Sequence, residues 1–387
     1  MKKFLLVSFF FLALFFTTEC AEVIAIGDLH GDLENALHTF ELAGIISEQD
    51  SKDSNLDLLV QDNQIVIQMG DILDRGSNGL VLLHLMMHWH NQTKQSHVFT
   101  LENYRIQQFV QLIGNHEVLN LKQKFQYVNI GELSDESYRE AFTNEKSEER
   151  QHLISNTHAV TVVDGVVYVH AGLLPSMFEN HWNSANARIE GINMYLRNAL
   201  QTHKKHNTFL SQQGPMWTRE LANGDCEKLY ETLELLNAKH MVVGHTVQKN
   251  GRVNIKCFDP KRMMSLVLID TGISSIYGGN LCAVKILNGR YLTAYYLDQN
   301  VTFDLQTNHH VSEIPPQTIP FKSVMYRYLY QQWRNMQTLF TFIEQQISLA
   351  WPFLLAILSL VVVNCLTQFC CFENDIENDS KKQKFIF

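Results

Sequence analysis

Five short apolar runs along the chain end abruptly at polar motifs. The runs are rich in β-branched residues, and glycine or a polar residue closes each of them, as is typical of buried strands. They are Val23 to Ile26, Ile65 to Met69, Phe109 to Ile113, Val166 to Val169 and Met241 to Val243. Because strand ends in an open α/β sheet face one shared crevice, the polar residues that follow these runs are predicted to meet there.

A helix and two hairpins are predicted in the rest of the chain. Apolar residues from Leu80 to Trp89 follow helical spacing. Asp164-Gly165 and Asn288-Gly289 lie between paired strand-like runs and are typical of hairpin turns. We expect the second hairpin, formed by residues 281–287 and 290–297, to close a second sheet.

Two polar inserts interrupt this pattern. Leu121 to Glu149 is rich in charged and polar side chains, and Phe178 to Gln213 carries the other insert. They flank His116 and His170, which lie in two of the polar motifs. We therefore expect the inserts to form a helical cap that shapes substrate choice.

The amino-terminal end has the pattern of a secretory signal peptide. Lys2 and Lys3 precede an uncharged apolar run from Phe4 to Phe16, and small residues follow. This order predicts a signal peptide at residues 1–20 that is removed near Cys20 or Ala21. The apolar run is short for a membrane span, and an uncleaved signal anchor is the alternative interpretation.

A second apolar stretch, from Ile347 to Phe372, contains no charged side chain and is long enough for a membrane helix. A polar tail follows it, whereas a glycolipid-anchor signal ends in its hydrophobic segment. We therefore predict a single-pass type I membrane protein of the secretory pathway, and an amphipathic helix lying on the membrane is the alternative. The predicted parts are a lumenal or extracellular domain at 21–312, a linker and juxtamembrane helix at 313–346, a transmembrane helix at 347–372 and a cytoplasmic tail at 373–387.

The composition is that of one well-packed domain flanked by these segments. Of the 387 residues, 45% are hydrophobic and 18% are charged, which is enough apolar material for one large core. A formal net charge of −9 offers no basic face for nucleic acid. Cys226, Cys257 and Cys282 of the expected lumenal domain allow one disulfide and one free thiol, and the sequence leaves the pair open. Asn91 and Asn300 begin glycosylation triplets consistent with lumenal exposure.

The polar motifs supply the ligands of a metal site. Carboxylate, imidazole and amide groups without a thiolate suit Mn, Fe or Zn rather than a structural cysteine-bound zinc. One ion would leave ligands unused, so we expect two, with Asp71 as the bridge. Such a pair lowers the pKa of a shared water and holds the attacking and leaving oxygens of a phosphoryl group. The predicted ligands are Asp28, His30, Asp71, Asn115, His170 and His245.

The five motifs, GDLHGD, GDILDRG, GNHE, HAG and GHT, occur in an order that resembles the calcineurin-like metallophosphoesterases, in particular their phosphoprotein phosphatase branch. The resemblance covers roughly residues 21–300. It implies an α/β fold, a two-sheet β-sandwich with helices on both outer faces. It assigns Asp28, His30 and Asp71 to a first metal, and Asp71, Asn115, His170 and His245 to a second.

The resemblance also implies roles for residues beside the ligands. His116 of the GNHE motif is the expected general acid, because an imidazolium oriented by a carboxylate donates a proton well near neutral pH, and Asp74 is the expected partner. Arg75 offers a planar fork of donors for two phosphate oxygens. Asn115 and Arg219 are further predicted phosphate contacts, and a structural ion pair is the alternative for Arg219.

Two departures from the eukaryotic serine/threonine phosphatases indicate a branch. Residues Asp270 to Gly279 stand where those enzymes carry a toxin-binding SAPNYC sequence, which this chain lacks. Together with the sequence Gly172 to Pro175, the difference makes the chain similar to the Shewanella-like phosphatases of bacterial origin. Asp32 and Glu117 are expected to orient ligands through hydrogen bonds rather than to bind metal.

The sequence therefore predicts a membrane-tethered phosphomonoesterase with two metal ions, a metal-bridging hydroxide nucleophile and a histidine general acid. Manganese is the expected metal, with iron or zinc as alternatives. The expected substrates are phosphoserine, phosphothreonine or phosphotyrosine in proteins, or a small phosphate ester. A nucleotide or dinucleoside polyphosphate hydrolase is the alternative, and a non-catalytic membrane-tethered binding protein is the remote one. The physiological substrate, the metal, the organelle and the oligomeric state are left open.

Overall fold

The computed structural model describes residues 21–47, 56–99, 105–179, 181–201 and 208–311, which fall within the first of two units of the chain, Met1–Ile314. The second unit, Pro315–Phe387, lies outside the described residues. The predicted signal peptide, linker, transmembrane helix and cytoplasmic tail also lie outside them, so these assignments stay predictions. Within the described ranges, no helix has both the length and the apolar character needed to cross a membrane.

The first sheet contains the strands that carry the first three motifs. Strand β1 pairs in parallel with β2, and β2 pairs in parallel with β5, so their carboxyl ends lie at one edge. The other neighbour of β1 is β11, which runs antiparallel to it. The order along the seven-stranded sheet is β14-β13-β12-β11-β1-β2-β5. The bounds are β1 Glu22–Ile26, β2 Gln64–Gln68, β5 Phe109–Gln111, β11 Ala283–Leu287, β12 Tyr291–Tyr295, β13 Asn300–Asp304 and β14 His309–Val311.

The second sheet carries the remaining motifs. Strand β8 pairs in parallel with both β7 and β10, so His170 and His245 follow adjacent parallel strands. The order of this five-stranded sheet is β6-β7-β8-β10-β9. The bounds are β6 Val160–Val163, β7 Val166–Val169, β8 His240–Val243, β9 Asn254–Asp259 and β10 Met264–Leu268, and β3 His97–Phe99 and β4 Arg105–Gln107 form a separate two-stranded sheet.

The two sheets pack face to face and form a sandwich. Val23 and Ala25 of β1 enter the core that also contains Tyr168 and Val242 of the second sheet. The alternate β1 residues, Ile24 and Ile26, belong instead to the core under the helices on the outer face. Burial of both faces explains why the sequence reads as continuous apolar runs rather than as an alternating pattern. The predicted α/β architecture with a two-sheet sandwich is therefore confirmed.

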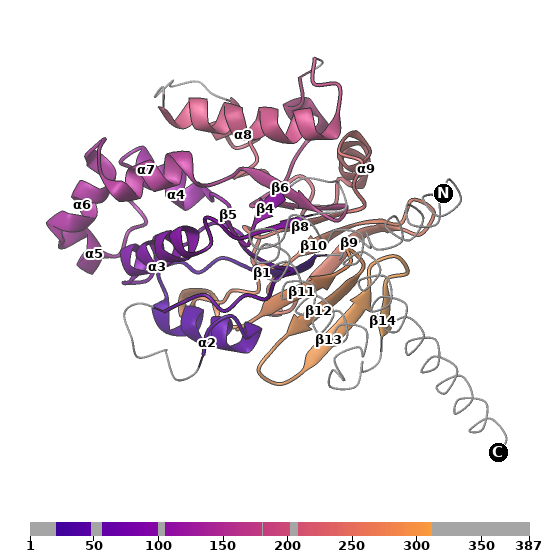
Figure 1. Ribbon diagram of the computed structural model, residues 1–387, viewed down its shortest axis with the longest axis horizontal. Coiled ribbons are helices and arrows are strands. Elements are labelled where there is room, and N and C mark those ends of the chain that lie inside the picture. The colour runs from indigo at the N-terminus through magenta and orange to yellow at the C-terminus, as the bar shows by residue number, and fades with distance from the viewer. Residues whose placement is uncertain (1–20, 48–55, 100–104, 180, 202–207, 312–387) are drawn as a thin grey trace, which may run out of the picture. The chain divides into compact units, whose positions relative to one another are not determined.

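Helices cover the outer face of each sheet (Figure 1). Phe40 and Trp89 pack the first two helices against the first sheet, with ring centroids 5.0 Å apart. The predicted helix at 80–89 is confirmed, and both inserts are helical in their described parts; Figure 1 shows α4 to α7 side by side. The bounds are α2 Leu33–Ala43, α3 Gly79–Gln92, α4 Asn115–Leu121, α5 Ile130–Ser134, α6 Glu136–Thr143, α7 Glu148–Ser155, α8 Ala185–Gln201 and α9 Cys226–Leu235, with 3-10 turns η1 Pro175–Met177, η2 Thr208–Leu210 and η3 Ser275–Tyr277.

Both hairpin turns are confirmed, but one hairpin lies in a different sheet from the one expected. Asp164 and Gly165 have φ values of 49° and 74°, and Asn288 and Gly289 have 57° and 60°, as this turn type requires. The second hairpin, β11–β12, was expected to close a second sheet, and this was wrong. Strand β11 pairs with β1 in the first sheet, a contact across most of the chain that local patterning does not encode.

A disulfide joins Cys226, at the start of α9, to Cys257 in the edge strand β9. Their Cα atoms are 5.2 Å apart. Cys282 is buried and remains a free thiol. The structure thus selects the pair that the sequence left open. Asn91 and Asn300 are exposed, and their glycosylation stays a prediction.

Candidate active site

Backbone contacts show that the five motifs meet where the two sheets end. The N–H groups of Leu29 and His30, after β1, donate to the carbonyl of Asp71, after β2, at 3.0 and 2.9 Å. Across the sandwich, the His245 N–H donates to the Asp28 carboxylate at 3.1 and 3.2 Å. The residues after strands of both sheets therefore lie at one shared edge, as the sequence predicted.

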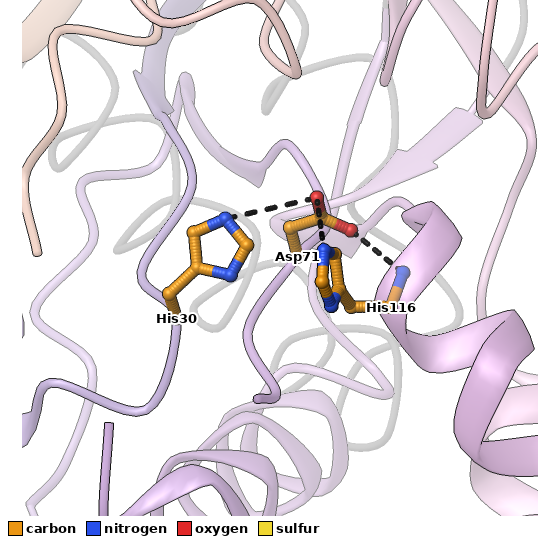
Figure 2. Close-up of side chains that lie close together, drawn as sticks. All are labelled: His30, Asp71 and His116. Atoms are coloured by element: carbon orange, nitrogen blue, oxygen red, sulfur yellow. Dashed lines mark hydrogen bonds and ion pairs between the residues drawn. The ribbon is translucent and has the colours of Figure 1, made fainter. Parts of the chain in front are cut away.

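Two groups of possible metal ligands share Asp71. Within each group, ligand atoms lie within 4.8 Å of one another. In the first group His30 Nε2 and His116 Nε2 lie 3.8 and 4.0 Å from Asp71 Oδ2 (Figure 2). In the second, His170 Nε2 lies 3.3 Å from the same oxygen and His245 completes the set. A carboxylate common to two groups is the arrangement that a bridging ligand requires.

Three of the histidines have one ring nitrogen fixed by a backbone carbonyl. His170 Nδ1 lies 2.8 Å from the Met69 carbonyl, His30 Nδ1 lies 3.3 Å from that of Leu73, and His245 Nε2 lies 3.2 Å from that of Trp217. Because a carbonyl only accepts, each of these nitrogens carries the hydrogen. With a metal bound, the other nitrogen would present its lone pair to the centre, as a metal-binding histidine must.

Asn115 lies among the second group. The amide atom that points into the group is 2.9 Å from His245 Nδ1 and 3.3 Å from both His170 Nε2 and Asp71 Oδ2. In the orientation drawn this atom is the oxygen, so lone pairs converge on one space; in the flipped orientation the amide would donate to those acceptors instead. A cation satisfies converging lone pairs without the flip, and the donor set therefore fits a metal ion.

The charges of the site also fit a cation. Burial, together with the charges of Asp270 and Asp71, holds the pKa of Asp28 well above its usual value. Burial lowers the pKa of His30 to about 4 and that of His245 to about 3, so both rings are neutral at pH 7. Burial also lowers the pKa of His170, but Asp71 and Asp28 outweigh it and raise the pKa to about 10. The neutral rings of His30 and His245 can bind a cation directly, whereas Asp28 and His170 are groups that would release protons when metal binds.

Glu117 holds the Asp71 loop in place. This fully buried carboxylate accepts hydrogen bonds from the N–H groups of Asp71, Ile72 and Gly114 at 2.8 Å, and from Leu73 at 3.1 Å. A Cβ at position 114 would collide with the Asp71 carboxylate, so only glycine fits there. Glu117 thus orients a ligand through its backbone, in line with its expected role.

Asp32 acts at a different place from the one expected. Its carboxylate accepts from the Asn35 N–H at 3.2 Å and so caps α2. It also accepts from the backbone N–H and the hydroxyl of Ser275, both at 2.7 Å. Asp32 therefore anchors the loop at η3, which carries Tyr277 against the His30 ring, with ring centroids 5.0 Å apart.

Several site residues occupy a strained backbone region. Several motif residues have φ values in the left-handed region, which non-glycine residues rarely adopt. Such strain persists where surrounding structure imposes it, and it gathers at functional sites. The φ values are 46° at His30, 52° at Asp71, 71° at both Asp74 and Arg75, and 60° at His245.

His116 differs from the three histidines above because its partner is a carboxylate. Its Nδ1 lies 2.6 Å from Asp74 Oδ2, and its Nε2 faces Asp71 (Figure 2). Burial lowers the pKa of His116, but the charges of Asp71 and Asp74 outweigh this and raise it. Asn120 donates to the other Asp74 oxygen at 2.7 Å. Sequence reasoning missed Asn120, whose only signal was its place one helical turn after His116.

Arg75 lies at the rim of the site against an aromatic ring. Its guanidinium carbon is 4.4 Å from the centroid of Tyr127, whose ring also lies 5.3 Å from that of His116. Arg75 Nε is buried and has no hydrogen-bond partner among the described residues. A buried donor without a partner is unusual in a native fold, and this agrees with the predicted phosphate role of Arg75.

Arg219 contacts the last motif rather than open space. Its Nη1 donates to the His245 carbonyl and to the Thr246 hydroxyl, both at 2.9 Å. The side chain is exposed, so its remaining donors face solvent beside the second ligand group. The structure therefore gives Arg219 an anchoring contact and leaves its phosphate role as a prediction.

Comparisons with known proteins agree with this arrangement. A family model described as calcineurin-like phosphoesterase matches residues 21–249. An uncharacterized protein of Schizosaccharomyces pombe is 30% identical over 281 residues, which cover 68% of this chain and 76% of that protein. Shewanella-like protein phosphatase 1 of Plasmodium berghei is 28% identical over 272 residues, covering 65% of this chain and 67% of that one.

A solved structure has the same fold. The cold-active protein-tyrosine phosphatase of a psychrophilic Shewanella species superposes with a TM-score of 0.56 at 20% identity, covering 73% of this chain and 80% of that chain. The resemblance expected from the sequence is thus confirmed. The chain belongs to the calcineurin-like phosphoesterase family and is a hydrolase that acts on phosphate esters.

Proposed function

We propose that this protein is a two-metal phosphomonoesterase whose physiological substrates are phosphorylated protein side chains. The observation that carries the proposal is the shared Asp71 carboxylate. Two ligand groups converge on it, and the His116 ring, hydrogen-bonded to Asp74, lies 4.0 Å from the same oxygen. These residues could therefore hold a pair of cations and bring a proton donor to the same phosphoryl group.

The ring contacts support separate roles for the histidines. In His30, His170 and His245, the ring nitrogen that points away from the centre donates to a neutral carbonyl, which leaves the other nitrogen to face the ligand groups. In His116 the corresponding nitrogen, Nδ1, donates to the Asp74 carboxylate instead, which favours the charged ring. We therefore assign His116 as the general acid, although its Nε2 also lies within reach of the first ligand group.

The chain's own residues then bind the ester and move a proton. Two divalent ions held by Asp28, His30, Asp71, Asn115, His170 and His245 would supply an activated water and positive charge at the phosphoryl oxygens. Arg75 binds phosphate oxygens through its guanidinium, whose Nε has no other hydrogen-bond partner among the described residues. Asn115 and Arg219 are further contacts to the phosphate. His116 Nε2 releases its proton to the leaving oxygen as the P–O bond breaks, and Asp74 holds the ring.

Protein substrates are favoured by the relatives and by the rim of the site. Two of the similar proteins carry protein phosphatase names, one of them a tyrosine phosphatase. Tyr127, which lies against Arg75 at the rim, is 39% exposed. Ile130, three residues further along the chain, is 81% exposed. Exposed apolar side chains of this kind suit a peptide flanking the phosphoresidue. We infer that the insert at 121–149 contributes to substrate choice.

We further propose that the catalytic domain acts in the lumen of the secretory pathway or outside the cell, tethered to the membrane. The predicted signal peptide and apolar carboxyl-terminal stretch support this, and the Cys226–Cys257 disulfide is the structural support. Such bonds persist in oxidising compartments.

The test compares substrate classes on the purified full chain. The protein is stripped with a chelator, reloaded with Mn, Fe or Zn, and assayed with phosphoserine, phosphothreonine and phosphotyrosine peptides and with nucleoside and dinucleoside polyphosphates. We expect metal-dependent phosphate release from at least one phosphopeptide class. Turnover confined to nucleotides would overturn the proposed substrate class, and no turnover with any metal would overturn the enzymatic proposal.

A further inference from the structure

A chain of hydrogen bonds links the helical insert to the His116–Asp74 pair. The Tyr138 hydroxyl, in α6, donates to Asn120 Oδ1 at 3.0 Å. The Asn120 amide nitrogen, in α4, donates to Asp74 Oδ1 at 2.7 Å and to the His116 carbonyl at 2.9 Å. Since Asp74 Oδ2 faces His116 Nδ1 at 2.6 Å, both Asp74 oxygens have a fixed donor.

Each member of this chain is shielded from water. Tyr138 is 1% exposed, and Asn120 and Asp74 are 0% exposed. Water therefore cannot replace a lost partner, and a missing bond leaves a buried polar group unsatisfied. Within the described part of the chain, His116 and Asn120 are the side chains that hydrogen-bond the Asp74 carboxylate, and Tyr138 holds Asn120.

The direction of each bond follows from its partners. Asn120 must turn its amide nitrogen toward Asp74 and the His116 carbonyl, because both only accept. Its oxygen is then left for Tyr138, which must donate. Burial and the nearby charge of Asp74 hold the pKa of Tyr138 far above its usual value, so the phenol keeps its proton.

Packing within the insert holds Tyr138 in place. Its ring centroid lies 5.1 Å from that of Phe142 and 6.4 Å from that of Phe125. The buried Arg150 side chain donates to the carbonyls of Leu121, at 2.9 Å, and Phe142, at 3.2 Å, which ties the end of α4 to α6. The insert is thus a rigid support behind the acid.

We propose that Asn120 and Tyr138 are positioning residues that hold Asp74 so that His116 delivers its proton to the leaving group. This inference rests on the proposed function, because it takes His116 as the general acid. It assigns part of the insert a second task besides substrate choice, since α6 supports the proton donor from behind while the Tyr127 side lines the rim.

The test separates leaving-group assistance from general damage. The phenolate of phenyl phosphate is a poor leaving group that needs a proton. The p-nitrophenolate of p-nitrophenyl phosphate departs readily without one. We expect Tyr138→Phe in the full chain to lower kcat for phenyl phosphate about tenfold, the lower end of the cost of losing an outer hydrogen-bonding partner. The kcat for p-nitrophenyl phosphate and both KM values should stay close to wild type. Asn120→Ala should produce the same selectivity with a larger loss.

Tyr230→Phe is the matched control. Tyr230, in α9, is also a largely buried tyrosine, and its hydroxyl donates to the Cys257 carbonyl at 3.0 Å. This substitution should leave the ratio of the kcat values for the two substrates unchanged. Equal losses with both substrates in Tyr138→Phe, or no loss, would overturn the proposal.

A second readout does not depend on turnover. The His116 Nδ1 proton in its 2.6 Å contact should resonate far downfield in the proton NMR spectrum, and His116→Asn identifies it by removing the signal. Tyr138→Phe should shift this resonance upfield, and Tyr230→Phe should not; an unmoved resonance would count against the positioning role. If the wild type hydrolyses neither ester, the proposed function fails on the kinetics, while the resonance still decides whether Tyr138 supports the pair.

Discussion

The carboxylate of Asp28 accepts hydrogen bonds from the backbone N–H of His245 at 3.1 and 3.2 Å, although the two residues are 217 positions apart in the chain. Asp28 follows β1 of the first sheet, and His245 follows β8 of the second. This contact therefore closes the sandwich at the site itself. The stability of the fold and the assembly of the metal ligands are coupled at this point.

Removal of divalent metal should abolish hydrolysis and lower the melting temperature. A ligand present at 100 times its Kd stabilises the folded state by about 2.7 kcal/mol per site, and chelation removes that contribution. Thermal unfolding and p-nitrophenyl phosphate turnover, measured after chelation and again after adding Mn, Fe or Zn, check this. Asp28→Asn should need more metal for the same activity. Full activity in the metal-free protein would exclude the two-metal assignment.

Replacement of His116 by Asn should lower kcat for esters with poor leaving groups by about 10²–10⁴, because proton donation to the leaving oxygen is lost. Asp74→Asn should have a smaller effect in the same direction, since the ring remains but loses the carboxylate at 2.6 Å. Steady-state kinetics with alkyl and aryl phosphates measure both. Equal activity of wild type and His116→Asn across the series would mean that another group supplies the proton.

The two arginines should respond differently to substitution. Arg75→Lys removes a fork of donors, so kcat/KM should fall by about 10- to 100-fold at any metal concentration, the cost of losing a charge-assisted hydrogen bond. Arg219→Ala removes the 2.9 Å bonds to the His245 carbonyl and the Thr246 hydroxyl. If Arg219 mainly anchors that loop, excess metal should restore activity; a KM that stays high at saturating metal would assign it to phosphate binding.

Loss of the Cys226–Cys257 disulfide should destabilise the domain. For a sequence separation of 31 residues, the chain-entropy model predicts a loss of about 3–4 kcal/mol in the free energy of unfolding. Urea unfolding of the double variant Cys226→Ser with Cys257→Ser, with and without reductant, measures it. Cys282→Ala is the control, because reductant should lower its stability as much as that of the wild type. A double variant as stable as the oxidised wild type would argue against the pairing.

Stability should fall as the pH drops from about 6.5 to 4. His240 joins β8 to β10 through a 2.9 Å contact with the Ser265 hydroxyl, and burial and Lys239, opposed in part by Asp304, lower its pKa from 6.5 to about 4. In this window the unfolded chain binds a proton that the folded chain does not, so acid favours unfolding. The loss attributable to His240 should be on the order of 1–3 kcal/mol at pH 4.

His240→Gln isolates this contribution, because glutamine can keep a hydrogen bond to Ser265 but does not titrate. Its urea midpoint should depend less steeply on pH than that of the wild type. The exposed His309 is the control, and His309→Gln should leave the slope unchanged. Identical slopes for wild type and His240→Gln would show that the buried ring is not the source.

Local pattern was enough to predict the strands and turns that frame the site. The β-branched runs before Asp28 and Asp71 are buried on both faces, and that burial produces the uninterrupted apolar pattern. The turn at Asp164 was predictable because its backbone conformation suits few residue types. By contrast, the pairing of β11 with β1 was not, since many apolar strands could pair there without any local signal.

The partners of individual side chains were the least predictable feature. The sequence around Asp32 would be the same whether this residue orients a metal ligand or binds Ser275. Asp32 binds Ser275 because the η3 loop packs beside it in the folded chain. Asn120 and Tyr138 have no motif at all, because any amide and phenol brought together by two helices could form their bond.

By itself, the sequence determined which residues are the candidates for the chemistry, because metal ligands and acid–base groups belong to few residue types and here follow strand ends in a characteristic order. Only the tertiary structure decided how those residues act together: which carbonyl fixes His170, which loop Asp32 holds, and which side chain lies behind Asp74. The physical reason is that these relationships depend on how two sheets and an insert pack, and packing brings together residues whose separation along the chain leaves no periodic trace.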